Sequence, residues 1–417
     1  MVRAGVLVEA AGLYLMQGLG NLLGIATVAL LARRLGPEAY GVLAFAQGLV
    51  NYLAHLVNYG FDLSASREAS RRKGLEGLSA LVAEVLLARS LLLALSLALL
   101  LLVSLSPPME GVRGLLLPLS GLLLGQALNP YWLLLGTGRV LLGQGVDLAQ
   151  RLLTLLLLFL LVGGPEDLPL AGLAIGGGAL LASGIGLLQA LLLLGLRPRL
   201  PKASRAWEGL RKGGWLFFSQ AGSLLFTGGN PFLLGLFAPP VEVGRYAAAE
   251  KIALTALALA HPPFRVLYSR FMGLTPGSGT FASLGRKSLL LFGGLGAGLG
   301  GLLASSAPVL LELVYGEAYG EAAPLLGILT LGVLPQFLAT LWGGLGLLSL
   351  GRDRHYTLSL LLSGALQVLL ILLLAPAHGA MGTAWAVAAG SWILALLQGI
   401  ALARAGINPL FWALQRR

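Results

Sequence analysis

The 417-residue chain contains no cysteine, and only 11% of its residues are charged. The absence of cysteine excludes disulfides, thiolate metal sites and cysteine nucleophiles. A soluble globular domain carries about 25% charged residues, so the low charge excludes a soluble enzyme of this length. The sequence also lacks an HExxH motif, the Lys-Ser/Thr of a P-loop and a recognisable catalytic triad. We therefore expect no metal site and no resident cofactor.

What the chain does have is apolar residues, which make up 57% of it and give a mean hydropathy of +0.86. They gather in continuous runs of about 20 residues, the length of a helix that crosses a membrane. Barrel strands would instead alternate over about ten residues. The sequence therefore predicts an all-α polytopic membrane protein with about 12 transmembrane helices. The expected spans are residues 13–32, 40–59, 81–105, 115–135, 141–162, 170–196, 215–237, 246–268, 288–311, 323–348, 356–374 and 379–402.

The net charge of +11 comes from basic residues that cluster in alternate loops. If the N-terminus lies in the cytoplasm, most Arg and Lys residues fall on the cytoplasmic side. The outer loops then hold only Arg33, Arg34, Arg113 and Arg245. This asymmetry is the positive-inside pattern, so we expect both termini in the cytoplasm. Topology then accounts for the positive charge, and no nucleic-acid partner is expected.

The two halves of the chain resemble each other. A gap-free shift of 206 residues places Tyr40 on Tyr246 and His55 on His261. Similarity through Leu-, Gly- and Ala-rich composition alone is the alternative, and the shared turn with its tyrosine favours a true repeat.

A repeated six-span unit keeps its orientation in the membrane. We therefore expect two six-helix bundles around a central cavity. Their predicted ranges are residues 1–200 and 214–417, joined by a basic cytoplasmic linker at 201–213.

Polar side chains form stripes along three of the predicted spans. In the second span they are spaced by four, four, three and four residues, which places them on one face of a helix. The stripes consist of Gln47, Asn51, His55, Asn58 and Asp62 in the second span, Gln17 and Asn21 in the first, and Gln220 and Asn230 in the seventh. Hydrogen bonds between helices are one explanation. A water-filled cavity is the other, and we favour it because the stripes of the first and seventh spans superimpose under the same shift of 206 residues.

Three basic residues inside spans are candidates for contacts with an anionic substrate: Arg89, Arg151 and Lys251. A guanidinium matches phosphate oxygens well. For Arg89 the alternative is a side chain that extends to the membrane surface. For Arg151 the alternative is a structural ion pair with Asp147, four residues earlier.

Four further residues could bind or release a coupling ion: His55, Asp62, Glu250 and His261. Histidine exchanges protons near neutral pH, and buried carboxylates can do so as well.

Several segments carry a family resemblance. They are ARRLGPEAYG (32–41), NYGFDLSASREASRR (58–72), NPYWLLLGTGRV (129–140), YAAAEKIAL (246–254), APVLLELVYGEAYGEAAPLLGIL (307–329) and LGLLSLGRDRHYTLSLLLSGALQ (345–367). With them the chain resembles the polysaccharide-transporter family that includes O-antigen (Wzx-type) flippases. That family belongs to the superfamily of multidrug and oligosaccharidyl-lipid exporters. The resemblance covers essentially the whole chain.

The resemblance implies twelve helices around a V-shaped cavity in the cytoplasmic membrane. It implies alternating access that moves a polyprenyl-diphosphate-linked oligosaccharide while its lipid tail stays among the membrane lipids. Lys251, Arg151 and Arg89 would then contact the diphosphate. Coupling to protons or sodium occurs in some members, and polysaccharide polymerase and assembly proteins are the expected partners.

Two other functions are compatible with a membrane bundle. A cation-coupled multidrug exporter of the same fold would need an acidic pocket, whereas the charges inside these spans are mixed or basic. A membrane polysaccharide polymerase would need a large outer loop with catalytic residues, and the predicted outer loops are short.

Overall fold

A computed structural model describes residues 2–72, 74–198, 207–208, 210–211, 214, 217, 229–410 and 412, with side chains from Gly12 onward. The regular structure within these ranges is helical. Eight helical segments among them are long and apolar enough to cross a membrane. The predicted all-α polytopic membrane fold is thus confirmed, while the total of about 12 spans stays a prediction.

The chain divides into two compact units, Met1–Gln220 and Ala221–Arg417. The predicted linker at 201–213 lies largely outside the described residues, so the predicted domain boundaries stay untested. Each unit is described separately.

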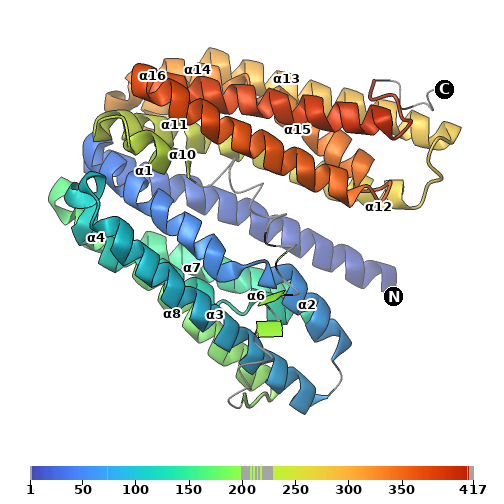
Figure 1. The fold of residues 1–417 in the computed structure, drawn as a ribbon, viewed down its shortest axis with the longest axis horizontal. Coiled ribbons are helices and arrows are strands. Elements are labelled where there is room, and N and C mark those ends of the chain that lie inside the picture. Colours follow the sequence, from blue (N-terminus) through green and yellow to red (C-terminus); the bar gives the residue numbers. More distant parts are fainter. Residues whose placement is uncertain are drawn as a thin grey trace. The chain divides into compact units, whose positions relative to one another are not determined.

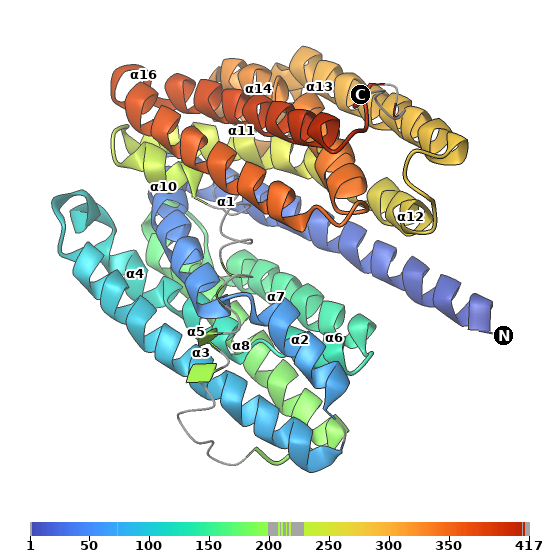
Figure 2. The same cartoon turned by 45° about the vertical axis from the view of Figure 1, so that its right-hand side comes forward.

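The N-terminal unit is a bundle in which α7 and α8 run side by side (Figure 1, Figure 2). Helix α8 also packs along α5, and α7 packs along α1. Its helices are α1 (Val2–Asn58), α2 (Phe61–Arg71), α3 (Leu75–Ser104), η1 (Pro107–Val112), α4 (Arg113–Leu119), α5 (Gly121–Leu128), α6 (Tyr131–Gly136), α7 (Val140–Leu161), η2 (Pro165–Asp167) and α8 (Leu168–Leu194).

Helix α1 contains two of the predicted spans because it folds back at Gly36. That residue has φ 72° and ψ 173°, a left-handed backbone that glycine adopts without strain, and Pro37 begins the second arm. The helical stretch Gly12–Arg71 has 60 residues and would measure about 90 Å if straight. Since the hydrocarbon core is about 30 Å thick, the bend allows two crossings.

A close approach of backbones joins α8 to α4 and α5. A Cβ atom on Gly176 would collide with the carbonyl oxygen of Pro118 and would lie 3.3 Å from the Cα of Gly121. The adjacent Gly177 has nothing within 4 Å of such an atom. Small residues allow helices to pack this closely in membranes.

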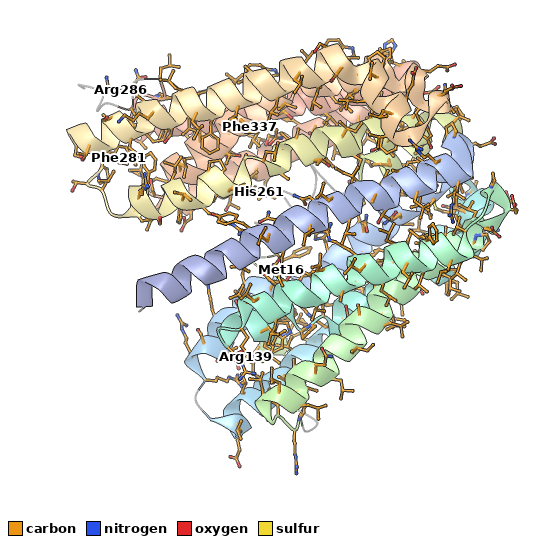
Figure 3. All side chains as sticks on the ribbon, turned by 180° about the vertical axis from the view of Figure 1, so that it is seen from behind. Met16, Arg139, His261, Phe281, Arg286 and Phe337 are labelled. Atoms are coloured by element: carbon orange, nitrogen blue, oxygen red, sulfur yellow. The ribbon has the colours of Figure 1, made fainter. Side chains whose placement is uncertain are left out.

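The C-terminal unit contains a second long helix that folds back, α16, which bends at Gly379 (Figure 1). Phe281 and Phe337, both labelled in Figure 3, are buried in the core of the C-terminal unit. Phe281 packs against Trp412. The described helices are α10 (Asn230–Gly235), α11 (Pro240–Ala258), α12 (His261–Met272), α13 (Gly279–Tyr315), η3 (Glu317–Ala322), α14 (Ala323–Thr330), α15 (Val333–Ala339), the π-helix η4 (Thr340–Leu347) and α16 (Asp353–Arg404).

Candidate functional site: a polar cavity in the N-terminal unit

A cavity of about 500 Å³ lies inside the N-terminal unit, among α1, α2 and α5 to α8. Its wall is rich in polar side chains, although the helices around it are apolar. The polar members are Asn51, His55, Asn58, Asp62, Gln126, Asn129, Tyr131, Gln144, Asp147, Gln150 and Ser183. We call this space the polar cavity.

The stripe predicted along the second span forms one side of the polar cavity. Asn51, His55 and Asn58 from α1 line it, together with Asp62 from α2. The stripe continues across a break in the helix, where Tyr59 has φ 46° and Gly60 has φ 74°. The fifth predicted member, Gln47, is half-buried on α1 and is not part of this wall.

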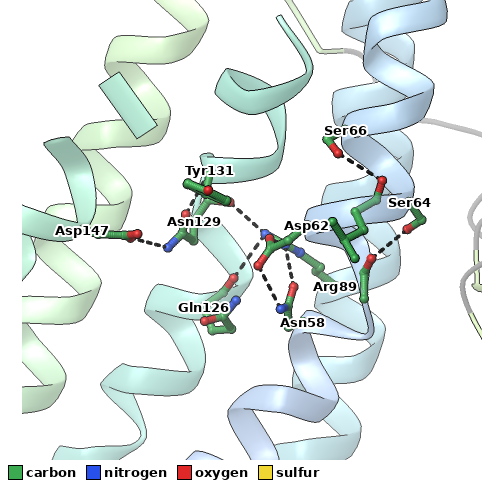
Figure 4. A network of polar contacts seen from close by, with 11 residues as sticks. Asn58, Asp62, Ser64, Ser66, Arg89, Gln126, Asn129, Tyr131 and Asp147 are labelled. Carbon is green, nitrogen blue, oxygen red and sulfur yellow. Dashed lines mark hydrogen bonds and ion pairs between the residues drawn. The ribbon is translucent and has the colours of Figure 1, made fainter. Parts of the chain in front are cut away.

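Arg89 and Asp62 form an ion pair beside the polar cavity (Figure 4). Nη2 of Arg89 lies 3.1 Å from a carboxylate oxygen of Asp62 and donates to Oδ1 of Asn58, also at 3.1 Å. The amide of Asn58 donates to the other Asp62 oxygen at 3.0 Å. Arg89 is 0% exposed, so its charge is committed to Asp62. Arg89 therefore does not extend to the membrane surface, and its contact with a substrate stays a prediction that this ion pair disfavours.

Arg89 also holds the end of α5. Its Nη1 donates to the carbonyl oxygens of Asn129 at 2.8 Å and Gln126 at 3.3 Å. In a continuous helix the Gln126 carbonyl would accept from residue 130, but Pro130 has no N–H. The guanidinium therefore satisfies a carbonyl that the proline leaves without its helical donor.

Asp147 is a member of the polar cavity that the predicted site did not include. It accepts a long hydrogen bond of 3.5 Å from the Asn129 amide. Among the described residues it forms no ion pair with Arg151. Instead, Nη1 of the exposed Arg151 donates to the Gly20 carbonyl at 2.7 Å. The spacing of Gln144, Asp147 and Arg151, three and four residues apart, could have shown a polar face on this span.

The C-terminal unit contains a separate buried carboxylate, Glu250 on α11. It accepts hydrogen bonds from the Asn230 amide at 2.6 Å and the Tyr246 hydroxyl at 2.9 Å. Asn230 was predicted to line a substrate cavity, but it is 1% exposed and binds Glu250 and Gln367 instead. Lys251, the next residue on α11, is half-buried.

The other predicted residues lie apart from these two clusters. Gln17 and Asn21 are half-buried on α1, and His261 is exposed at the start of α12 (Figure 3). Gln220 lies outside the described residues. No cluster of three metal-ligating His, Asp or Glu side chains occurs in the part of the chain that the structure describes.

Comparison with known proteins places these features in a family. Residues 6–273 match the model of a family described as "Polysaccharide biosynthesis protein". A relative from Escherichia coli (strain K12), named "Putative O-antigen transporter", is 25% identical over 86% of this chain and 87% of its own length. A relative of the same name from Shigella dysenteriae is 25% identical over 63% of this chain and 66% of its own.

Two solved structures show the same fold. The lipid II flippase MurJ, in an inward closed conformation, superposes with a TM-score of 0.74 over 95% of this chain and 87% of its own, at 13% identity. An inward-facing multidrug resistance transporter of the MATE family superposes with a TM-score of 0.66 over 93% and 94%, at 14% identity. The chain thus belongs to the polysaccharide biosynthesis protein family and has the fold shared by MurJ and MATE transporters.

Proposed function

We propose that this protein is a flippase that moves a polyprenyl-diphosphate-linked oligosaccharide across the cytoplasmic membrane by alternating access. The observation that carries the proposal is the similarity to a relative named for O-antigen transport, which extends over 86% of the chain. The fold shared with a lipid II flippase supports a lipid-linked sugar as the class of substrate. Both termini would lie in the cytoplasm, because the basic loops then face inward.

The diphosphate of such a substrate needs cationic contacts inside the membrane. Arg151 is twelve positions into the 22-residue α7, and its side chain is exposed. One Nη group binds the Gly20 carbonyl, which leaves further guanidinium N–H groups for phosphate oxygens. We assign Arg151 and Lys251 to this role and withdraw Arg89 from it.

We further propose that the polar cavity couples transport to protons or sodium ions. Asp62 is neutralised by Arg89. Asp147 has only an amide as a hydrogen-bond partner among the described residues, so it is the carboxylate best placed to take up a cation. His55 lines the same wall, while Glu250 and His261 are the corresponding candidates in the C-terminal unit.

The test is transport by purified protein in liposomes that contain a fluorescent lipid-linked oligosaccharide. The fraction of label exposed on each leaflet is followed with an impermeant quencher, with and without a proton or sodium gradient. We expect transport that Arg151→Ala and Lys251→Ala reduce and that Arg286→Ala, at an exposed arginine on α13, leaves unchanged. Transfer no faster than in protein-free liposomes would reject the flippase.

Asp147→Asn separates coupling from transport in the same assay. We expect this variant to lose the response to the ion gradient while substrate still equilibrates between leaflets. A full gradient response in the variant would reject Asp147 as the coupling group.

A cation-coupled drug exporter is the second candidate, because MATE transporters share the fold and Asp147 gives the polar cavity an acidic member. Drug uptake into the same liposomes, with no transfer of the lipid-linked sugar, would favour the exporter.

A further inference from the structure

A second cavity in the N-terminal unit is lined by Phe61, the residue next to Asp62 of the polar cavity. It has a volume of about 310 Å³ and lies between α2 and α3. Its wall includes Ser64, Glu68, Arg72 and Glu84. These residues lead toward the basic loop at the end of α2, so we call this space the vestibule.

Carboxylates outnumber cations among the charged side chains of α2 and α3 that line the vestibule. Arg72 lies 3.1 Å from Glu68 and 2.8 Å from Glu84. Burial lowers the pKa of Arg72, but its hydrogen bonds to Glu84 and Glu68 outweigh this effect and raise the pKa above its ordinary value. Arg72 therefore stays charged, and the three side chains together carry one net negative charge when both carboxylates are ionised. With Glu208, which also lines the vestibule, its wall holds three glutamates and one arginine. A negatively charged cavity concentrates small cations.

Three groups in contact with one another connect the wall of the vestibule to the wall of the polar cavity, and we call them the barrier. The ring of Phe61, 3% exposed, lines the vestibule. The guanidinium carbon of Arg89 lies 5.8 Å from the centre of that ring. Arg89 in turn binds Asp62, which lines the polar cavity. The order across the barrier is thus ring, guanidinium and carboxylate.

The barrier stands at a bend, which makes a local opening feasible. Tyr59 is one of two non-glycine residues with positive φ in the described part of the chain, a backbone conformation that residues with a side chain rarely adopt. Arg89 spans this bend through its contacts with Asn58 and Asp62. Its Nε–H has no acceptor among the described residues, so a water molecule that passes Phe61 meets a donor ready to bind it.

We infer that the vestibule and the polar cavity form one route for water and small cations, which Phe61 and the Arg89–Asp62 pair close in this structure. The route would supply the intramembrane carboxylates from the membrane face that carries Arg71 and Arg72. It is a property of the N-terminal unit alone and is independent of which lipid-linked substrate is moved.

The absence of native cysteine allows a clean test with single engineered thiols. Ala54→Cys places a thiol in the polar cavity, and Ser64→Cys places one in the vestibule. Each variant is held in sealed membrane vesicles of known orientation, without substrate. Ag⁺ in chloride-free buffer is the small-cation probe, and thiols that it has not modified are counted with a fluorescent maleimide after denaturation.

With Phe61 intact, Ser64→Cys should react quickly from the Arg72 face and Ala54→Cys slowly. Adding Phe61→Ala should speed the Ala54→Cys reaction about tenfold or more, which corresponds to an activation free energy lower by about 1.4 kcal/mol. The smaller change Phe61→Leu should give an intermediate rate and serves if Phe61→Ala does not fold. Leu63→Ala, an exposed position on the same helix, is the matched control and should leave the rate unchanged.

Three results would overturn the inference. The first is an Ala54→Cys rate that is the same with Phe61, Phe61→Ala and Phe61→Leu. Ala54→Cys could equal Ser64→Cys while Phe61 is intact, so that no barrier exists. Leu63→Ala could speed the reaction as much as Phe61→Ala, which would indicate general loosening. Because no substrate is present, these results are distinguishable from failure of the flippase proposal.

Discussion

Two ion pairs in the N-terminal unit have the same N–O distance, 3.1 Å, but differ in burial. The Arg89 side chain of the pair with Asp62 is 0% exposed, whereas Arg72 and Glu68 are 22% and 45% exposed. Asp62→Asn leaves a buried guanidinium without its counter-charge, a change that costs about 3–5 kcal/mol. Because Asp62 itself is 29% exposed and asparagine keeps an acceptor oxygen, we expect the lower end, about 3 kcal/mol. Glu68→Gln should cost about 0.2–1 kcal/mol, since solvent screens that pair.

Thermal unfolding in detergent, followed by tryptophan fluorescence, checks the difference. In a unit of about 200 residues, 3 kcal/mol lowers Tm by about 6–12 °C, whereas the Glu68→Gln control should lower it by about 4 °C at most. Adding Arg89→Gln to Asp62→Asn should cost less than the sum of the two single changes, because the orphaned charge is removed. Equal Tm losses for Asp62→Asn and Glu68→Gln would refute the argument that burial decides the value of the pair.

Gly176→Ala should destabilise the protein by about 1–3 kcal/mol because its Cβ meets a backbone carbonyl of α4; the same thermal assay should find Gly177→Ala unchanged. Glu250→Leu leaves two buried donors without an acceptor and should cost about 1–3 kcal/mol for each, whereas Glu250→Gln keeps an acceptor and should unfold near the wild-type Tm. Arg151→Ala should slow lipid-linked oligosaccharide transfer in liposomes without lowering the yield of folded protein; an unchanged rate would remove Arg151 from the substrate contacts.

The sequence predicted the fold well where a helix is a single apolar run. The expected spans 141–162 and 170–196 differ from α7 and α8 by only one or two residues at each end, because hydropathy alone sets their length. The expected span 115–135 is instead broken into α4, α5 and α6. Pro130 makes a break there foreseeable. The break leaves the Gln126 carbonyl without its helical donor, and the sequence does not show that Arg89 supplies a replacement.

The face of α1 that meets the polar cavity was also predictable. Because of the helical period, Asn51, His55 and Asn58 lie on one face of α1. Their side chains therefore line the same wall. Asp147 was harder to assign, since its four-residue spacing from Arg151 suggested a local pair. The structure gives each a non-local partner, Asn129 and the Gly20 carbonyl, and helical spacing contains no information on such partners.

Arg89 shows what a sequence argument needs in order to separate structural charges from functional ones. A charge inside a membrane must be compensated, and the same half of the chain offers Asp62 as a counter-charge and a carbonyl left without a donor by Pro130. Arg89 meets both needs, which makes it the weaker candidate for contact with a ligand. Arg151 has a backbone carbonyl as its partner and forms no ion pair with another described residue. Its guanidinium therefore keeps N–H groups for a further partner, which makes it the stronger candidate to meet a diphosphate.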